Sequence, residues 1–229
     1  MRHSGKAAKA GFKLLSISLV AALVLSAIGI IAAHSAGFNP TLVVVPVVFV
    51  WVLFAVFTLN FFRDPDPRVP PGANLVVSPA HGKVDVIGEI TEPQFMGGQC
   101  QRISIFLSVI DVHVQNAPVT GKIAFYKYNT GQFLSALKAE SAIHNENLLL
   151  GFEASDPPGK KVGVRVLAGV LARRIVPWAK QGEEVARGER LSLVQFGSRA
   201  DVYLPREAKI KIQLGDHVVG GETVLAVFE

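Results

Sequence analysis

Two uncharged apolar runs constrain the N-terminal part of the chain more than any other feature. They cover residues 14–33 and 42–62, and neither contains a charged side chain. Each run is long enough to cross the hydrocarbon core of a bilayer as a helix, which takes roughly 20 residues. Because the intervening segment, residues 34–41, is short, the pattern predicts a transmembrane helical hairpin over residues 1–62.

Basic residues flank only one side of this hairpin. They are Arg2, Lys6, Lys9 and Lys13 before the first run, and Arg63 and Arg68 after the second. The connecting segment contains no Lys or Arg. Positively charged flanks stay in the cytoplasm. We therefore expect both ends of the hairpin, and the domain that follows it, on the cytoplasmic side of the cell membrane.

The apolar runs are also compatible with two other interpretations. A basic start followed by an apolar run also describes a cleaved signal peptide. The first run is longer than a usual signal core, however, and the sole cysteine, Cys100, excludes the intrachain disulfides of a secreted domain. A re-entrant hairpin, kinked at Pro46, remains an alternative to two full spans. Either geometry tethers the rest of the chain to lipid.

Composition narrows the class of partner. Hydrophobic residues make up 50% of the chain and the mean hydropathy is +0.38. Lys and Arg outnumber Asp and Glu by 23 to 18, which favours an anionic partner such as a phospholipid surface or nucleic acid. Because basic and aromatic residues are not interleaved, we predict membrane lipid and no nucleic acid. The lone cysteine also gives no basis for a zinc site, and we predict no metal.

Two short signatures each occur twice after residue 73. Residues 63–73 are rich in proline and are interpreted as a linker. In the domain predicted over residues 74–229, PAHGKV at 79–84 is echoed by PVTGKI at 118–123, and GEEVARGE at 182–189 by GDHVVGGE at 215–222. Each reads as a turn that leads into a strand.

These signatures resemble the two halves of lipoyl and biotinyl domains, which are flattened antiparallel barrels. Having each of them twice predicts a mainly β fold, a lipoyl/biotinyl-like double half-barrel with a few short helices. We expect helices near residues 134–140 and 170–180. The rest of the domain alternates β-branched residues with Gly and Pro, as strands and turns do.

The pair Gly197 and Ser198 is the candidate reactive centre. It lies between two strand-like runs and between the repeated loops. Glycine leaves its carbonyl open to attack by the following hydroxyl and tolerates the strained backbone that the attack needs. The pair therefore permits an N-to-O acyl shift, although Gly-Ser pairs are also common in ordinary turns.

FGSRADVYLP at 196–205, SIFLSVIDVHVQNAPVTGKI at 104–123 and SPAHGKV at 78–84 together resemble the short-chain branch of the phosphatidylserine decarboxylase family. The resemblance implies a proenzyme that cuts itself between Gly197 and Ser198. Its products would be a β chain, residues 1–197, and an α chain, residues 198–229, which form a heterodimer. Ser198 would become a covalent pyruvoyl cofactor. Through a Schiff base, this cofactor would decarboxylate phosphatidylserine to phosphatidylethanolamine and carbon dioxide.

The same resemblance assigns roles to two histidines. His113 matches the family's histidine that donates a proton after decarboxylation. His81 stands where family members have the aspartate of P-A-D-G, and Asn116 stands where the longer-chain branch has a second histidine. We hypothesise that His81 or His113 activates Ser198 for cleavage. The other histidines, His3, His34, His144 and His217, are interpreted as solvated residues.

Alternatives from other functional classes stay open at this point. A non-enzymatic membrane adaptor could also join a hairpin to a lipoyl-like barrel, although such proteins usually carry a long helical hairpin that this sequence lacks. A pyruvoyl decarboxylase could instead act on another amino-acid-derived substrate. A higher homo-oligomer is compatible with either enzyme.

Overall fold

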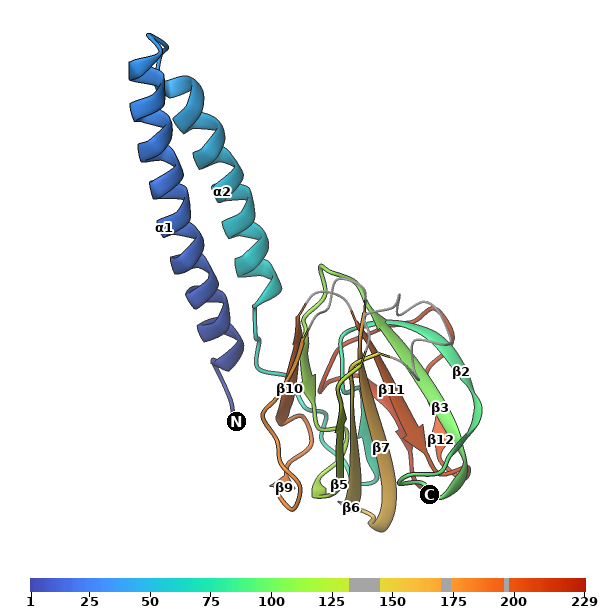
Figure 1. Ribbon diagram of the computed structural model, residues 1–229. Helices are drawn as coiled ribbons and strands as arrows, with labels where there is room; N and C mark the ends of the chain where they lie inside the picture. The colour runs from blue at the N-terminus through green and yellow to red at the C-terminus, as the bar shows by residue number, and fades with distance from the viewer. Residues whose placement is uncertain (132–144, 170–173, 196–197) are drawn as a thin grey trace. The chain divides into compact units, whose positions relative to one another are not determined.

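The computed structural model describes residues 1–131, 145–169, 174–195 and 198–229 (Figure 1). Its contacts divide the chain into two units. One unit is Gly5–Asp64, and the other is Pro65–Glu229 together with Met1–Ser4. The described secondary structure is helical in the first unit and consists of strands in the second.

The first unit is a hairpin of two helices, α1 (Lys6–Ser35) and α2 (Thr41–Phe61). Both are long and apolar enough to cross a membrane. Helix α1 begins before the apolar run and takes in three of the lysines that precede it, while α2 continues through Pro46. The two predicted helices are therefore confirmed.

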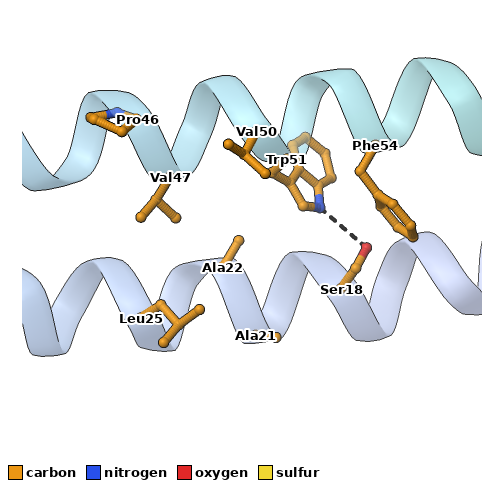
Figure 2. A pocket seen from close by; sticks show the side chains of 9 residues that line it. All are labelled: Ser18, Ala21, Ala22, Leu25, Pro46, Val47, Val50, Trp51 and Phe54. Carbon is orange, nitrogen blue, oxygen red and sulfur yellow. Dashed lines mark hydrogen bonds between the residues drawn. The ribbon is translucent and has the colours of Figure 1, made fainter.

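Small residues let the two helices approach each other closely. A side chain added at Gly29 would overlap Val43. Farther along the hairpin, the indole Nε1 of Trp51 donates a hydrogen bond of 3.2 Å to Ser18 Oγ, as Figure 2 shows. The same view contains an apolar groove of about 490 Å³ between the helices, which includes Phe54 among its lining residues. Close packing of this kind replaces the hydrophobic effect, which does not drive helices together in lipid.

The second unit is built on an eight-stranded antiparallel sheet with the order β13-β2-β3-β11-β7-β6-β5-β9. Its strands are β2 (Gly82–Glu92), β3 (Gly98–Leu107), β5 (Gly121–Asn129), β6 (Asn147–Ser155), β7 (Pro158–Ala168), β9 (Glu184–Val185), β11 (Ser198–Leu204) and β13 (His217–Val218). Two three-stranded sheets, β1-β14-β12 and β4-β10-β8, complete it. Their strands are β1 (Leu75–Val77), β14 (Val224–Val227), β12 (Lys209–Ile210), β4 (Val114–Asn116), β10 (Arg190–Gln195) and β8 (Arg174–Pro177).

The repeated signatures occupy matching places in the two halves of the large sheet. Strand β2 begins at Gly82 and pairs with β13, and β5 begins at Gly121 and pairs with β9. The loop glycines make equivalent hydrogen bonds in the two halves: Gly221 N donates to Ser78 O at 2.7 Å, and Gly188 N donates to Ala117 O at 2.8 Å. Each half therefore combines a turn and a loop from distant parts of the sequence. This arrangement confirms the predicted double half-barrel.

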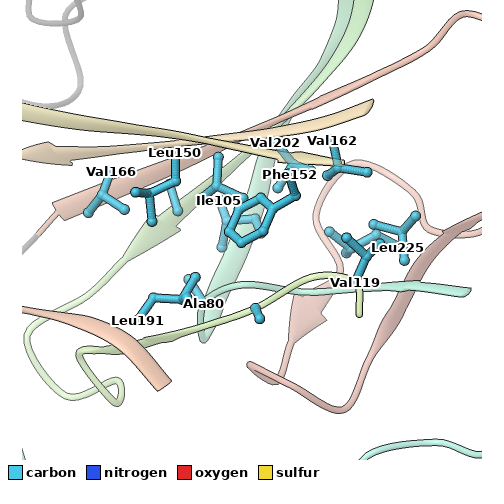
Figure 3. Close-up of a cluster of buried hydrophobic side chains, with 14 of the residues drawn as sticks. Ala80, Ile105, Val119, Leu150, Phe152, Val162, Val166, Leu191, Val202 and Leu225 are labelled. Carbon is cyan, nitrogen blue, oxygen red and sulfur yellow. The ribbon is translucent and has the colours of Figure 1, made fainter. Parts of the chain in front are cut away.

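Buried side chains fill the space that the sheets enclose, as Figure 3 shows. Along β11, Ala200, Val202 and Leu204 belong to this core, as strand alternation requires. Arg199 and Asp201 alternate with these residues in sequence and therefore face the outer side of the sheet. The inward face of β11 is thus defined by every second residue from Ser198 onward.

One of the two helix predictions within the β unit is wrong. The predicted helix at 170–180 is replaced, over its described part, by β8, which pairs with β10 in a register that joins Ile175 to Val194. The β-branched pair Ile175 and Val176 suits a strand once β10 is available as a partner. The helix predicted at 134–140 lies outside the described residues.

The glycines that open β2 and β5 provide a stability test of the repeat. A Cβ at Gly82 would overlap the Phe106 carbonyl oxygen, and one at Gly121 would overlap the Glu153 carbonyl oxygen. We expect Gly82→Ala and Gly121→Ala each to lower the free energy of unfolding by about 1–3 kcal/mol. Urea unfolding of the full chain in detergent micelles would measure this.

Gly88→Ala is the matched control, because a Cβ at that position in β2 meets open space. Equal stability of all three variants would contradict the equivalence of the two turns.

Candidate active site

Ser198 is the first residue of β11 and pairs on both sides, with Leu107 of β3 and Ala168 of β7. It shares the inward face of β11 with Ala200, and its relative exposure is 1%. Among the described residues, its Oγ has no hydrogen-bond partner. Burying a hydroxyl without a partner costs free energy, so such groups usually serve a purpose beyond packing. Its predicted cleavage partner, Gly197, lies outside the described residues.

The two ends of the loop of residues 108–113 contact strands that lie next to the Gly197–Ser198 segment. It leaves β3 directly after Leu107, the strand partner of Ser198. It ends at His113, whose carbonyl oxygen accepts a hydrogen bond of 3.0 Å from Val194 N in β10. Because β10 immediately precedes the Gly197–Ser198 segment, this loop brings His113 to the end of the sheet where Ser198 lies.

The His113 ring is completely buried, and its hydrogen bond fixes its tautomer. Its Nδ1 lies 2.9 Å from the carbonyl oxygen of Asp111. A carbonyl can only accept, so we assign the hydrogen to Nδ1. The second nitrogen, Nε2, is then the ring atom that can take up and release a proton. His113 therefore has the chemistry of a general acid or base.

Asp111 is held by contacts from two parts of the chain. Its Oδ2 accepts from Ser108 N at 2.8 Å and from Ser108 Oγ at 2.7 Å, and its Oδ1 lies 3.0 Å from His217 Nε2. Burial alone would raise the pKa of Asp111. The Ser108 hydrogen bonds and His217 outweigh burial, so the pKa lies below its ordinary value. Asp111 is therefore an anion at neutral pH.

A buried carboxylate stands on the other side of Ser198. Glu146 O accepts from Ala168 N at 2.9 Å, and Asn145 Nδ2 donates to Ala168 O at 2.7 Å. Both contacts hold the residue that pairs with Ser198 in β7. The relative exposure of Glu146 is only 5%. Ser198 thus lies between one polar group on the β3 side and another on the β7 side.

The Glu146 side chain is engaged by two further strands. Its Oε1 accepts from Ile175 N at 2.8 Å and from the Tyr128 hydroxyl. Burial and the neighbouring Glu146 carboxylate raise the pKa of Tyr128 to about 12. Glu146 therefore joins β5, β7 and β8 at this end of the sheet.

His81 lies at the same end of the sheet, two strands from β11. It directly precedes β2, in which Lys83 pairs with Phe106, and Phe106 pairs in turn with Arg199 of β11. Two strand spacings amount to roughly 10 Å. The structure thus places His81, His113 and Ser198 at one end of the sheet.

Asn116 has a structural position. Its Nδ2 donates to Gly188 O at 2.9 Å, and a Cβ at Gly220 would lie 2.9 Å from its Oδ1 and 3.0 Å from His81 Cδ2. Asn116 therefore contacts both repeated loops, beside His81. This contact pattern gives the amide a packing role in the repeat.

Sequence reasoning missed the side chains that support the site. The sequence predicts a solvated His217; its side chain is 60% exposed but forms a hydrogen bond with Asp111. The sequence holds no local signal for this contact, because 106 positions separate the two residues; the D-x-H spacing of Asp111 and His113 signals only the hydrogen bond between those two. For Glu146, the only signal was a charged residue between two asparagines directly before an apolar strand.

Comparisons with known proteins agree in pointing to one family. The sequence model of the family described as phosphatidylserine decarboxylase matches residues 54–226. The phosphatidylserine decarboxylase proenzyme of Desulfotalea psychrophila is 41% identical over 177 residues, which cover 77% of this chain and 82% of the relative. The proenzyme of Symbiobacterium thermophilum is 43% identical over 171 residues, covering 75% and 79%. That of Citrifermentans bemidjiense is 41% identical over 183 residues, covering 80% and 82%.

The Tyr128–Glu146 contact can be tested by titration. Because the raised pKa favours the neutral phenol in the fold, its stabilising effect is complete below pH 10 and is lost as the pH rises through about 12. We expect Tyr128→Phe to reduce the phenolate absorbance that develops near pH 12 by the contribution of one tyrosine, and Tyr126→Phe to leave that contribution in place. Burial also raises the pKa of Tyr203, so its absorbance remains at still higher pH. Unchanged absorbance near pH 12 in Tyr128→Phe would refute the contact.

Proposed function

Because the chain belongs to the phosphatidylserine decarboxylase family, we propose that it decarboxylates phosphatidylserine to phosphatidylethanolamine and carbon dioxide with a pyruvoyl group made from Ser198. Its relatives are decarboxylase proenzymes, which makes the chain a carboxy-lyase and argues against a non-enzymatic adaptor. The observation that carries the proposal is the position of Ser198. Its buried hydroxyl faces inward at the start of a central strand and has no partner among the described residues.

The first reaction is self-cleavage. Ser198 Oγ attacks the carbonyl carbon of Gly197, the peptide bond between them breaks, and the Ser198 nitrogen gains a proton as an ester forms. A base then removes the Ser198 α-proton and the Cβ–O bond breaks, which releases Gly197 as a carboxylate, the C-terminus of the β chain (residues 1–197), and leaves dehydroalanine at the start of the α chain (residues 198–229). Dehydroalanine tautomerises to an imine, water adds to the imine carbon and ammonia leaves, so that residue 198 becomes the pyruvoyl group. His113 Nε2 takes the hydroxyl proton, with His81 as the alternative base.

The surroundings of Ser198 suit the resulting group. Ser198 keeps its strand partners Leu107 and Ala168 after cleavage, so the new terminus stays in the interior. The pyruvoyl group supplies a carbonyl that takes up the substrate amine and the electron pair that departing carbon dioxide leaves. The conversion also removes the Ser198 hydroxyl, which is buried without a hydrogen-bond partner among the described residues.

His113 then acts as the proton donor. Its Nδ1–H is committed to the Asp111 carbonyl oxygen, so its Nε2 delivers a proton to the α-carbon of the product. Complete burial of the ring keeps competing water away from this proton.

The two chains remain together as a heterodimer. The α chain contributes β11, which is hydrogen-bonded between β3 and β7 of the β chain. It also contributes β13, which pairs with β2, and β14, which pairs with β1. Separating the chains would therefore break backbone ladders in two sheets.

The apolar hairpin supports a membrane location for this chemistry. We assign residues 1–62 as the anchor, 63–73 as the linker and 74–229 as the catalytic domain, with that domain on the cytoplasmic side. Anchoring brings the catalytic domain to the surface in which its lipid substrate resides.

Intact-mass measurement and carbon dioxide release test the proposal. The purified wild type in detergent micelles should contain two chains, split after Gly197, and should release carbon dioxide from phosphatidylserine but not from free serine. Ser198→Ala should stay a single chain with no activity. A single wild-type chain that still decarboxylates phosphatidylserine would exclude a group made from Ser198.

The processing base can be assigned with the same mass measurement. We expect His113→Ala to slow cleavage if His113 takes the Ser198 proton, and His81→Ala to slow it if His81 does. Full cleavage in both variants would exclude both histidines.

The orientation of the hairpin can be tested by cysteine labelling. The native Cys100 is buried, and burial raises the pKa of its thiol, so it should react poorly with maleimide. In intact bacterial cells, we expect a membrane-impermeant maleimide to label Phe38→Cys in the helix connection and to leave Asp66→Cys unlabelled. The reverse pattern would contradict a cytoplasmic catalytic domain.

A further inference from the structure

We propose that His217 is a positioning residue, which orients the His113 ring by holding Asp111 in place. The inference rests on the proposed role of His113 as the proton donor. It concerns a side chain that would belong to the α chain, whereas the ring that it orients would belong to the β chain. The α chain would thus contribute both Ser198 and a residue that positions the proton donor.

The contacts form a continuous path. His217 Nε2 lies 3.0 Å from Asp111 Oδ1, and the Asp111 main-chain oxygen lies 2.9 Å from His113 Nδ1. The carboxylate is held on one oxygen by Ser108 and on the other by His217. With both carboxylate oxygens engaged, the Asp111 backbone has little freedom to turn its carbonyl away from His113.

The two anchors of Asp111 differ in origin. Ser108 lies in the same loop, so it fixes the local turn but cannot fix the loop against the sheet. His217 lies in β13, which pairs with β2 through Lys83. The hydrogen bond between His217 and Asp111 therefore ties this loop to the edge strand of the large sheet.

The internal repeat shows that the fold alone does not call for a histidine here. In the other half of the sheet, Glu184 of β9 occupies the place of His217 and pairs with Lys122 as His217 pairs with Lys83. A glutamate in place of His217 would present a like charge to Asp111 and repel it. The histidine thus departs from the repeat in the half of the sheet that contains the 108–113 loop.

Steady-state kinetics of the cleaved full-length enzyme in mixed micelles with phosphatidylserine test this inference. We expect His217→Ala to lower kcat about ten-fold with KM unchanged, because a misdirected proton donor impairs chemistry and not binding. The pH profile of kcat should shift as well. His217→Gln keeps an N–H donor for Asp111 and should restore most of kcat. Glu184→Ala, the matched change in the other half, should match the wild type.

The outcomes separate this inference from the proposed function. Wild-type kcat and pH profile in His217→Ala would overturn the positioning role. Full decarboxylation by His113→Ala would instead overturn the proposed role of His113.

A second measurement applies if His217→Ala fails to mature. In the uncleaved Ser198→Ala proenzyme, the His113 Nδ1 proton should resist solvent exchange in NMR spectra, and adding His217→Ala should remove that protection. Unchanged protection would overturn the inference.

Discussion

The placement of β11 between β3 and β7 is the constraint on which the rest of the structure depends. This segment near the C-terminus lies in the middle of the large sheet, hydrogen-bonded on both sides to strands that precede it in the chain. Side chains alternate between the two faces of a strand, so a slip by one residue would exchange the faces. Ser198 would then point outward, and Arg199 would enter the core. The register of β11 therefore decides where the reactive residue lies.

Charges on the outer face oppose such a slip. Arg199 ion-pairs with Asp85 of β2, and Arg165 of β7 ion-pairs with Glu92. Asp201 is the strand partner of Arg165 and is almost fully buried. Burial raises the pKa of Asp201, and Ser104 and the nearby arginines partly offset this rise. Moving any of these groups into the apolar interior would cost far more than a lost hydrogen bond. Polar groups outside and apolar groups inside thus specify one register.

The scaffold is symmetric, but the site is not. Matching turns and loops build both halves of the large sheet, with glycines at Gly82 and Gly121 under the same steric demand. The polar groups beside Ser198 have no such match, since one is the Asp111 loop and the other is the Glu146 cluster. The repeat therefore builds the sheet, while the Asp111 loop and the Glu146 cluster, which are unrelated in sequence, supply the polar groups beside Ser198.

The apolar hairpin, the double half-barrel and the candidate residues Ser198, His113 and His81 follow from local patterns and from resemblance of short motifs. Such patterns record the periodicity and turn chemistry of neighbouring residues. The strand at Arg174–Pro177 did not follow, because its conformation depends on β10 as a partner. The contact of Asp111 with His217 was also decided only by the tertiary structure. It joins residues far apart in the chain, and pairing of β13 with β2 is what brings them within hydrogen-bonding distance.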